Sequence, residues 1–88
     1  MIPAGVTEIQ EEAFSGIASS EVHIPDQCTK IGPNAFRGSK VKKIFIPESV
    51  TEIDDTAFTE CVRVMIFCKI GSAAGEFATE HGILWQHR

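Results

Sequence analysis

Apolar residues recur along this chain with a period of 22 residues. Blocks that start at residues 2, 24 and 46 align without gaps, and six columns hold the same residue in all three blocks. These columns are Ile2, Ile24 and Ile46; Pro3, Pro25 and Pro47; Thr7, Thr29 and Thr51; Ile9, Ile31 and Ile53; Ala13, Ala35 and Ala57; and Phe14, Phe36 and Phe58. A period in the low twenties is too short for a pair of helices and is typical of one coil of a solenoid. We therefore expect repeats at 2–23, 24–45 and 46–67.

The pattern within one repeat predicts two short strands and a turn. In the segment 41–47, Ile44 and Ile46 alternate with outward positions, which indicates a strand that ends at the following proline. A second extended segment should follow at 50–53, with Val50 and Ile53 pointing inward. Acidic residues then open the segment 54–58, which we expect to form a short turn of helix. The phenylalanine column should fill the space between these layers.

Residues 68–88 carry no repeat signature and predict a cap. Ser72 is suited to the N-cap of a helix, and Gly82 to the left-handed position after its last turn. Between them, small and apolar residues recur at helical spacing, at Ala73, Ala74, Phe77, Ala78 and His81. We expect this helix to cover the last repeat, because each repeat buries its face only against a neighbour. Ile83, Leu84 and Trp85 should then form a short apolar closing segment.

The run IP-x-x-V-T-x-I-x-x-x-A-F, together with V-K-K-I-F-I-P, resembles the leucine-rich repeats of the BspA-like bacterial surface proteins. The resemblance covers essentially the whole chain. It implies an α/β repeat solenoid as a single domain over residues 1–88: a short right-handed coil, mostly β-strand and turn, with a C-terminal capping helix. It also implies a non-enzymatic protein-binding or adhesion module of a cell-surface or secreted protein, whose partner is a host or extracellular-matrix protein.

Two columns depart from the repeat pattern. Glu60 stands in the column of Gly16 and Gly38, and Ser19 and Arg63 stand where the second repeat has the apolar Val41. The departures fall in the first and third repeats, the outer ones of the array.

The composition narrows the classes of partner. The chain has 88 residues, which suits one domain, and a formal net charge of -4. An acidic balance argues against nucleic acid, because counterion release needs a basic face. No apolar run approaches the roughly 20 residues that span a bilayer, so we expect no membrane insertion. The first residues contain neither a basic segment nor an apolar core, which predicts no secretory signal in this chain.

The N-terminal end of the repeat array should be uncovered. Ile2 and Pro3 begin a full repeat directly after Met1. We therefore expect the chain to be the C-terminal piece of a longer repeat protein, or to shield this end by self-association.

No residue set predicts catalysis, a metal site or a cofactor. Cys28 and Cys68 fall in apolar columns and Cys61 falls in a turn column, so structural thiols are favoured over a disulfide or a metal site. None of the three histidines lies beside an exposed nucleophile. The carboxylates fall at turns and at helix starts, where solvation and the helix dipole explain them.

The candidate binding residues come from the outward positions of the predicted strands. If Val22, Ile44 and Ile66 face the core, the residues that follow them should face solvent and stack at about 4.8 Å, the distance between neighbouring strands. With the outward residues two positions earlier, the candidate partner-binding set is His23, Lys43, Phe45, Met65 and Phe67. Partner binding is favoured over two alternatives, namely stabilisation of the sheet by cross-strand stacking and self-association through this stripe.

Two charged sets have simpler explanations. Glu8, Lys30 and Glu52 alternate in sign in one column, so neighbouring repeats should pair them. Lys40 and Lys42, with Lys43, are expected to be a solvated turn in preference to an anion or glycan site. A purely structural role, as a segment that caps a longer solenoid, remains the alternative to the binding module.

Overall fold

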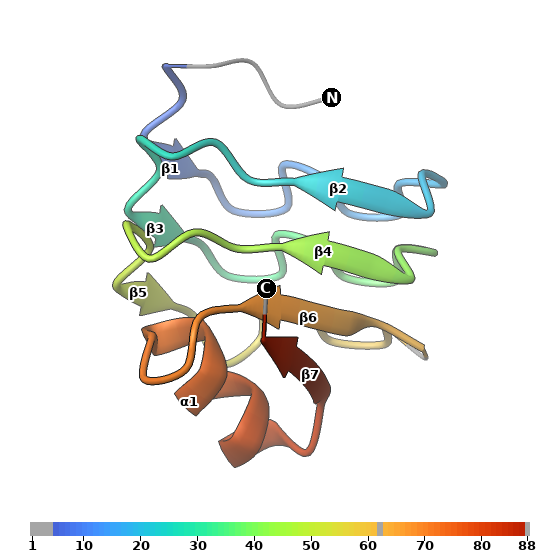
Figure 1. Cartoon of the computed structure of the whole chain (residues 1–88). Coiled ribbons are helices and arrows are strands. Elements are labelled where there is room, and N and C mark those ends of the chain that lie inside the picture. The colour runs from blue at the N-terminus through green and yellow to red at the C-terminus, as the bar shows by residue number, and fades with distance from the viewer. Residues whose placement is uncertain (1–4, 62, 88) are drawn as a thin grey trace.

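Two parallel sheets form the body of the protein (Figure 1). In the computed structural model, one sheet has the strand order β1-β3-β5 and the other has the order β2-β4-β6-β7. One helix, α1, follows β6. The elements are β1 (Glu8–Ile9), β2 (Glu21–His23), β3 (Lys30–Ile31), β4 (Lys43–Phe45), β5 (Glu52–Ile53), β6 (Met65–Cys68), α1 (Ala73–His81) and β7 (Leu84–His87).

The structure describes residues 5–61 and 63–87. The predicted start of the first repeat, at Ile2 and Pro3, therefore lies outside the described residues.

The 22-residue period appears directly in the pairing of the strands. Glu8 pairs with Lys30 and Lys30 pairs with Glu52 in one sheet, and Glu21, Lys43 and Met65 pair in the same way in the other. Each repeat thus adds one strand to each sheet, as a repeat fold requires. The right-handed sense of the coil remains a prediction.

Prolines set the length of the strands in the larger sheet. β2 and β4 have three residues each, and each ends two residues before a proline, Pro25 or Pro47. Proline has no backbone N–H for a ladder, so pairing stops there. After the third repeat Lys69 takes the place of the proline, and β6 extends to Cys68 with four residues.

The core lies between the two sheets and consists of repeat columns. Ile44 and Ile46 are fully buried, as the alternation predicts, and Val50 is fully buried as well. The predicted inward position of Ile53 is only partly buried. Stacked phenylalanine rings from the three repeats fill the centre, with ring centroids 5.6 Å and 5.4 Å apart in the order Phe14, Phe36, Phe58.

The prediction of a short turn of helix at 54–58 was wrong. The segment instead forms successive turns, in which the amide of Ala57 donates to the Asp54 carbonyl. The Ala57 and Thr59 carbonyls accept from the amides of Phe36 and Gly38 in the preceding repeat, at 2.8 Å and 2.9 Å. Acceptors that a helix would use within itself are therefore occupied by the neighbouring repeat.

The side chain of Asp54 supports the same turn. Its carboxylate accepts from the Thr56 amide at 2.9 Å and from the Thr56 hydroxyl at 2.6 Å. These hydrogen bonds hold the pKa of Asp54 below its usual value, because they favour the charged form. An acidic residue at this point thus stabilises a turn and not a helix start.

The capping helix is confirmed, and the closing segment has more structure than expected. Ser72 accepts a hydrogen bond from the Gly75 amide at the N-cap, and Gly82 has φ 68 at the C-terminal end. Phe77 packs against Phe58 with a centroid distance of 5.9 Å, so the helix covers the last repeat. The segment after Gly82 becomes strand β7, which pairs in parallel with β6.

The charged column of the smaller sheet is only half paired. The Lys30 Nζ atom lies 3.6 Å from Glu8 Oε2. In the part of the chain that the structure describes, Lys30 forms no ion pair with Glu52.

Within residues 5–61 and 63–87, no helix is both long enough and apolar enough to span a bilayer.

Candidate functional site

Three aromatic side chains form a stack on the outer face of the larger sheet, and we call His23, Phe45 and Phe67 the aromatic ladder. They are direct register partners on β2, β4 and β6. The His23 and Phe45 rings are 4.4 Å apart and inclined by 7°, and the Phe45 and Phe67 rings are 4.7 Å apart and inclined by 21°. Strand spacing alone brings side chains of one column to this distance.

The ladder lies outside because its neighbours lie inside. Val22, Ile44 and Ile66 are buried, so strand alternation turns the residues that follow them to the outer face. The structure corrects one part of the expectation: Phe45 and Phe67 are half-buried instead of fully exposed to solvent. The faces between neighbouring rings are covered by the stacking itself.

A second column runs beside the ladder. Glu21, Lys43 and Met65 are register partners, and β7 adds Leu84 as the next member. Met65 is half-buried, whereas 70% of Leu84 is exposed. The structure thus brings all five predicted residues onto one sheet face, and Glu21 links the two columns because its carboxylate lies 2.7 Å from His23 Nε2.

Sequence reasoning missed the contribution of β7 to this surface. Leu84 extends the column of Met65, and Gln86 extends the ladder next to Phe67. The apolar run at 83–85 was the available signal, but it carries no periodicity that separates a strand from a closing coil.

A cleft of about 630 Å³ opens beside Met65, between the third repeat and the cap, and we call it the cap cleft. Its apolar lining comes from both parts of the molecule. Arg63 lies at its rim, and so does His81, whose Nε2 atom is 3.4 Å from Asp55 Oδ1. The residues that line the cleft include Phe58, Arg63, Met65, Phe77, Ile83 and Leu84.

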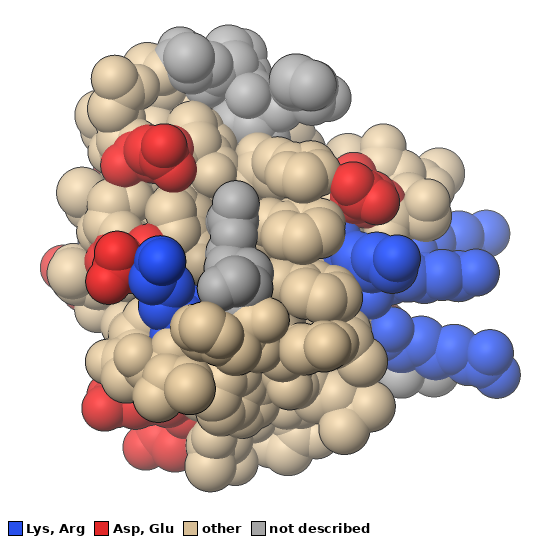
Figure 2. Space-filling view, in the orientation of Figure 1, with Lys and Arg blue, Asp and Glu red and all other residues tan. Residues whose placement is uncertain are grey.

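Basic side chains gather at the edge where β4 and β6 begin, and we call Lys40, Lys42, Lys43 and Arg63 the basic edge. Figure 2 shows Lys and Arg side chains projecting together on this side, while most of the acidic side chains in that view lie on the opposite side. All four residues are exposed. In the part of the chain that the structure describes, none of them takes part in an ion pair.

Arg63 is exposed, although Val41, its counterpart in the second repeat, is buried. Ser19, the counterpart in the first repeat, is exposed as well, and in the third repeat the next residue, Val64, is buried. An unpaired guanidinium in the core would lose its hydration without compensation. The third repeat therefore shifts its local pattern and sends a cation to the surface.

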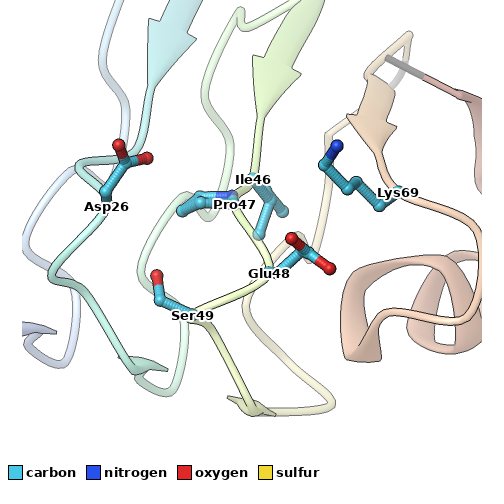
Figure 3. Close-up of a pocket in the computed structure, with 6 residues that line it drawn as sticks. All are labelled: Asp26, Ile46, Pro47, Glu48, Ser49 and Lys69. Atoms are coloured by element: carbon cyan, nitrogen blue, oxygen red, sulfur yellow. The ribbon is translucent and has the colours of Figure 1, made fainter.

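A pocket of mixed charge lies where β2, β4 and β6 end, away from the basic edge at which β4 and β6 begin. Figure 3 shows Asp26 and Glu48 on successive turns, with Lys69 beyond them. The Ser49 hydroxyl donates to the Cys28 carbonyl at 2.7 Å and so serves the fold. No group of three metal-ligating side chains occurs within residues 5–61 and 63–87.

All three cysteines are free thiols in the structure. Cys28 and Cys68 are fully buried in their apolar columns, and burial raises the pKa of both thiols. The half-buried Cys61 donates from Sγ to the Phe36 carbonyl. These environments suit small core residues and not reactive nucleophiles.

The geometry defines a repeat protein that presents an ordered outer sheet face. A family comparison gives the same class: the model described as "BspA type leucine rich repeat region (6 copies)" matches residues 1–70. The chain belongs to the BspA-type leucine-rich repeat family, which confirms the resemblance seen in the sequence. No curated protein and no solved structure matched the chain.

The match supports a general class of function. Leucine-rich repeats commonly mediate protein interactions and are generally non-enzymatic, and BspA-type members are typically surface-associated. The helix α1 and strand β7 lie after the matched residues. The repeat boundaries at 2–23, 24–45 and 46–67, with the cap at 68–88, remain predictions.

Proposed function

We propose that this protein is a non-enzymatic protein-binding and adhesion module of a bacterial cell-surface or secreted repeat protein. The observation that carries the proposal is the aromatic ladder on the outer face of the larger sheet. The resemblance to surface proteins supplies the location and the class of partner, a host or extracellular-matrix protein.

The physical basis is a rigid apolar surface with polar surroundings. Phe45, Met65 and Phe67 lie on strands held by backbone pairing, so binding does not have to order the main chain that carries them. Aromatic side chains at the centre of an interface contribute much of its binding energy, and a polar rim shields them from water. His23 and Lys43 supply part of such a rim.

The stacking geometry also favours a second candidate function. Rings 4.4 Å to 4.7 Å apart stabilise the sheet even where nothing binds to them. Under that alternative the chain is a structural segment that caps a longer solenoid, or a module that associates with itself through the ladder.

Immobilised extracellular-matrix proteins provide the test. We expect the wild type to be captured by at least one of them, and Phe45→Ser with Phe67→Ser to abolish the capture. The matched control is Lys30→Ser with Glu52→Ser, a double change on the other sheet. Unchanged capture by the ladder variant would remove the proposal.

Light scattering after size-exclusion chromatography separates self-association from partner binding. A dimer that dissociates in the Phe45→Ser, Phe67→Ser variant would assign the ladder to contacts between copies. A monomer at every concentration would leave the ladder available to a different protein.

A further inference from the structure

The basic edge and the cap cleft meet at Arg63, which belongs to both. We propose that together they bind an acidic, extended segment of a protein partner, whose carboxylates lie along the basic edge and whose apolar side chain enters the cleft. This inference rests on the proposed function, because it names the chemistry of the partner for the same sheet face.

The basic edge is held in place by the repeat backbone. Val41 is buried, so its neighbours Lys40 and Lys42 both turn outward. The Lys40 amide donates to the Ile17 carbonyl at 2.9 Å, and the Lys42 amide donates to the Ser20 carbonyl at 2.8 Å. The main chain that carries these cations is therefore ordered before any partner arrives.

The distribution of charge gives the edge its selectivity. The chain has 8 basic and 12 acidic residues, and four of the basic residues form the edge. The corresponding positions of the first repeat carry Ala18, Ser20 and Glu21, so the cluster is confined to the second and third repeats. An acidic segment is repelled by the molecule as a whole and attracted at this edge, which fixes where it docks.

The cap cleft supplies the apolar part of the site. Phe58 and Phe77 form its inner wall, and Met65 with Leu84 forms its rim beside the sheet. A volume of about 630 Å³ lies in the range of pockets that bind ligands and has room for an apolar side chain. Because Lys43 and Met65 are register partners, the cations and the cleft form one continuous surface.

The ladder favours a peptide over a glycan as the occupant. Sugars stack on open ring faces, but each face between neighbouring ladder rings is covered by the next ring at 4.4 Å or 4.7 Å. An acidic peptide with an apolar residue satisfies the cations and the cleft together.

Fluorescence anisotropy with labelled hexapeptides tests the inference on the whole chain. The probe is DELDFE, and its comparison peptides are DESDSE, which lacks the apolar residues, and NQLNFQ, which lacks the charges. We expect DELDFE to bind at least about tenfold more tightly than either, and its binding to weaken as salt is raised.

Two double variants localise the binding. Lys42→Glu with Arg63→Glu should weaken DELDFE at least about tenfold, since two attractive charges become repulsive. The matched control, Lys30→Glu with Lys69→Glu, changes the net charge by the same amount on other parts of the surface and should leave the affinity within about twofold. Circular dichroism of both variants tests whether they fold. The comparison peptides are measured with the wild type, so their result does not depend on the folding of a variant.

Each other result overturns the inference. Equal effects of the two double variants would show a response to net charge alone. Tighter binding of low-molecular-weight heparin than of DELDFE, with no dependence on apolar residues, would assign the edge to a polyanionic glycan. None of the peptides binding would reject this inference. If matrix proteins still capture the wild type and the Phe45→Ser, Phe67→Ser variant abolishes that capture, the proposed function remains in place.

Discussion

Two aromatic columns run through the same three repeats, one inside the molecule and one on its surface. The inner column is Phe14, Phe36 and Phe58, with Phe77 of the cap as its last member. The outer column is the aromatic ladder. The inner rings are 5.4 Å to 5.9 Å apart, whereas the outer rings are 4.4 Å to 4.7 Å apart.

The difference follows from what positions each column. The outer rings project from paired strands, so strand spacing sets their separation. The inner rings come from the turns between strands and settle where they fill the space between the sheets. The repeat stacks one column of rings between the two sheets and another on the outer face of the larger sheet. Burial decides which column stabilises the fold and which can contact a partner.

The largest effect is expected from the centre of the inner column. Phe36→Ala should lower the free energy of unfolding by about 3 to 5 kcal/mol, because a fully buried ring leaves a cavity between two repeats. Urea denaturation followed by circular dichroism measures this loss. The matched control is Phe45→Ala in the same repeat, which should cost clearly less. Equal losses would erase the distinction between the columns.

A smaller loss of stability is expected on the surface. Phe45→Ser with Phe67→Ser removes both stacked pairs of the ladder and should cost about 1 to 3 kcal/mol. The same denaturation experiment compares it with Phe36→Ala. A cost as large as that of Phe36→Ala would mean that the ladder serves the fold, and loss of binding in this variant would then say nothing about a partner.

Both columns could be predicted from the sequence, since they depend only on the period and on strand alternation. The capping helix could be predicted as well, because Ser72 and Gly82 are local signals. These features need no knowledge of which distant segments meet.

The features that escaped prediction depend on contacts between distant segments. The turn at 54–58 lacks a helix because the preceding repeat takes its carbonyls. Strand β7 exists because β6 has a free edge, and the cap cleft exists because α1 and β7 meet the third repeat at an angle that no sequence period records. Arg63 is exposed, as Ser19 is in the first repeat, and the column is buried in the second repeat at Val41.

A gain in stability is expected at the turn that leads from the inner column to the ladder in the third repeat. Glu60 has φ 64, and its counterparts Gly16 and Gly38 have φ 73 and φ 65. A side chain is strained in this region, so Glu60→Gly should raise the free energy of unfolding by about 0.5 to 1 kcal/mol. That range includes loss of the exposed contact between Arg37 Nε and Glu60 Oε1 at 3.4 Å, which contributes little.

The reverse change provides the control for this turn. Gly38→Ala adds a Cβ atom that meets nothing closer than 3.9 Å, so any loss reflects backbone conformation and not a clash. Thermal denaturation should move the two variants in opposite directions. If the denaturation midpoints of both variants shift in the same direction, the claim that the positive φ strains Glu60 is contradicted.

The smallest effect at neutral pH is expected from Cys28, whose column holds valine in the first and third repeats. Cys28→Val should leave stability at pH 7 nearly unchanged, because a small apolar side chain replaces a small buried thiol. The two proteins should differ only in alkali. Burial raises the pKa of the folded thiol above that of a thiol in the unfolded chain, so its contribution is complete below the unfolded pKa and is lost as the pH rises through the folded pKa.

Urea denaturation between about pH 7 and about pH 11 measures this difference directly. Wild type should lose more stability than Cys28→Val, because only wild type must keep a neutral thiol at this position. Cys68, whose pKa burial also raises, is present in both proteins, so the difference between their curves isolates Cys28. Parallel curves would mean that the buried position of Cys28 admits the thiolate as readily as water does, and burial would then not be what raises the pKa of this thiol.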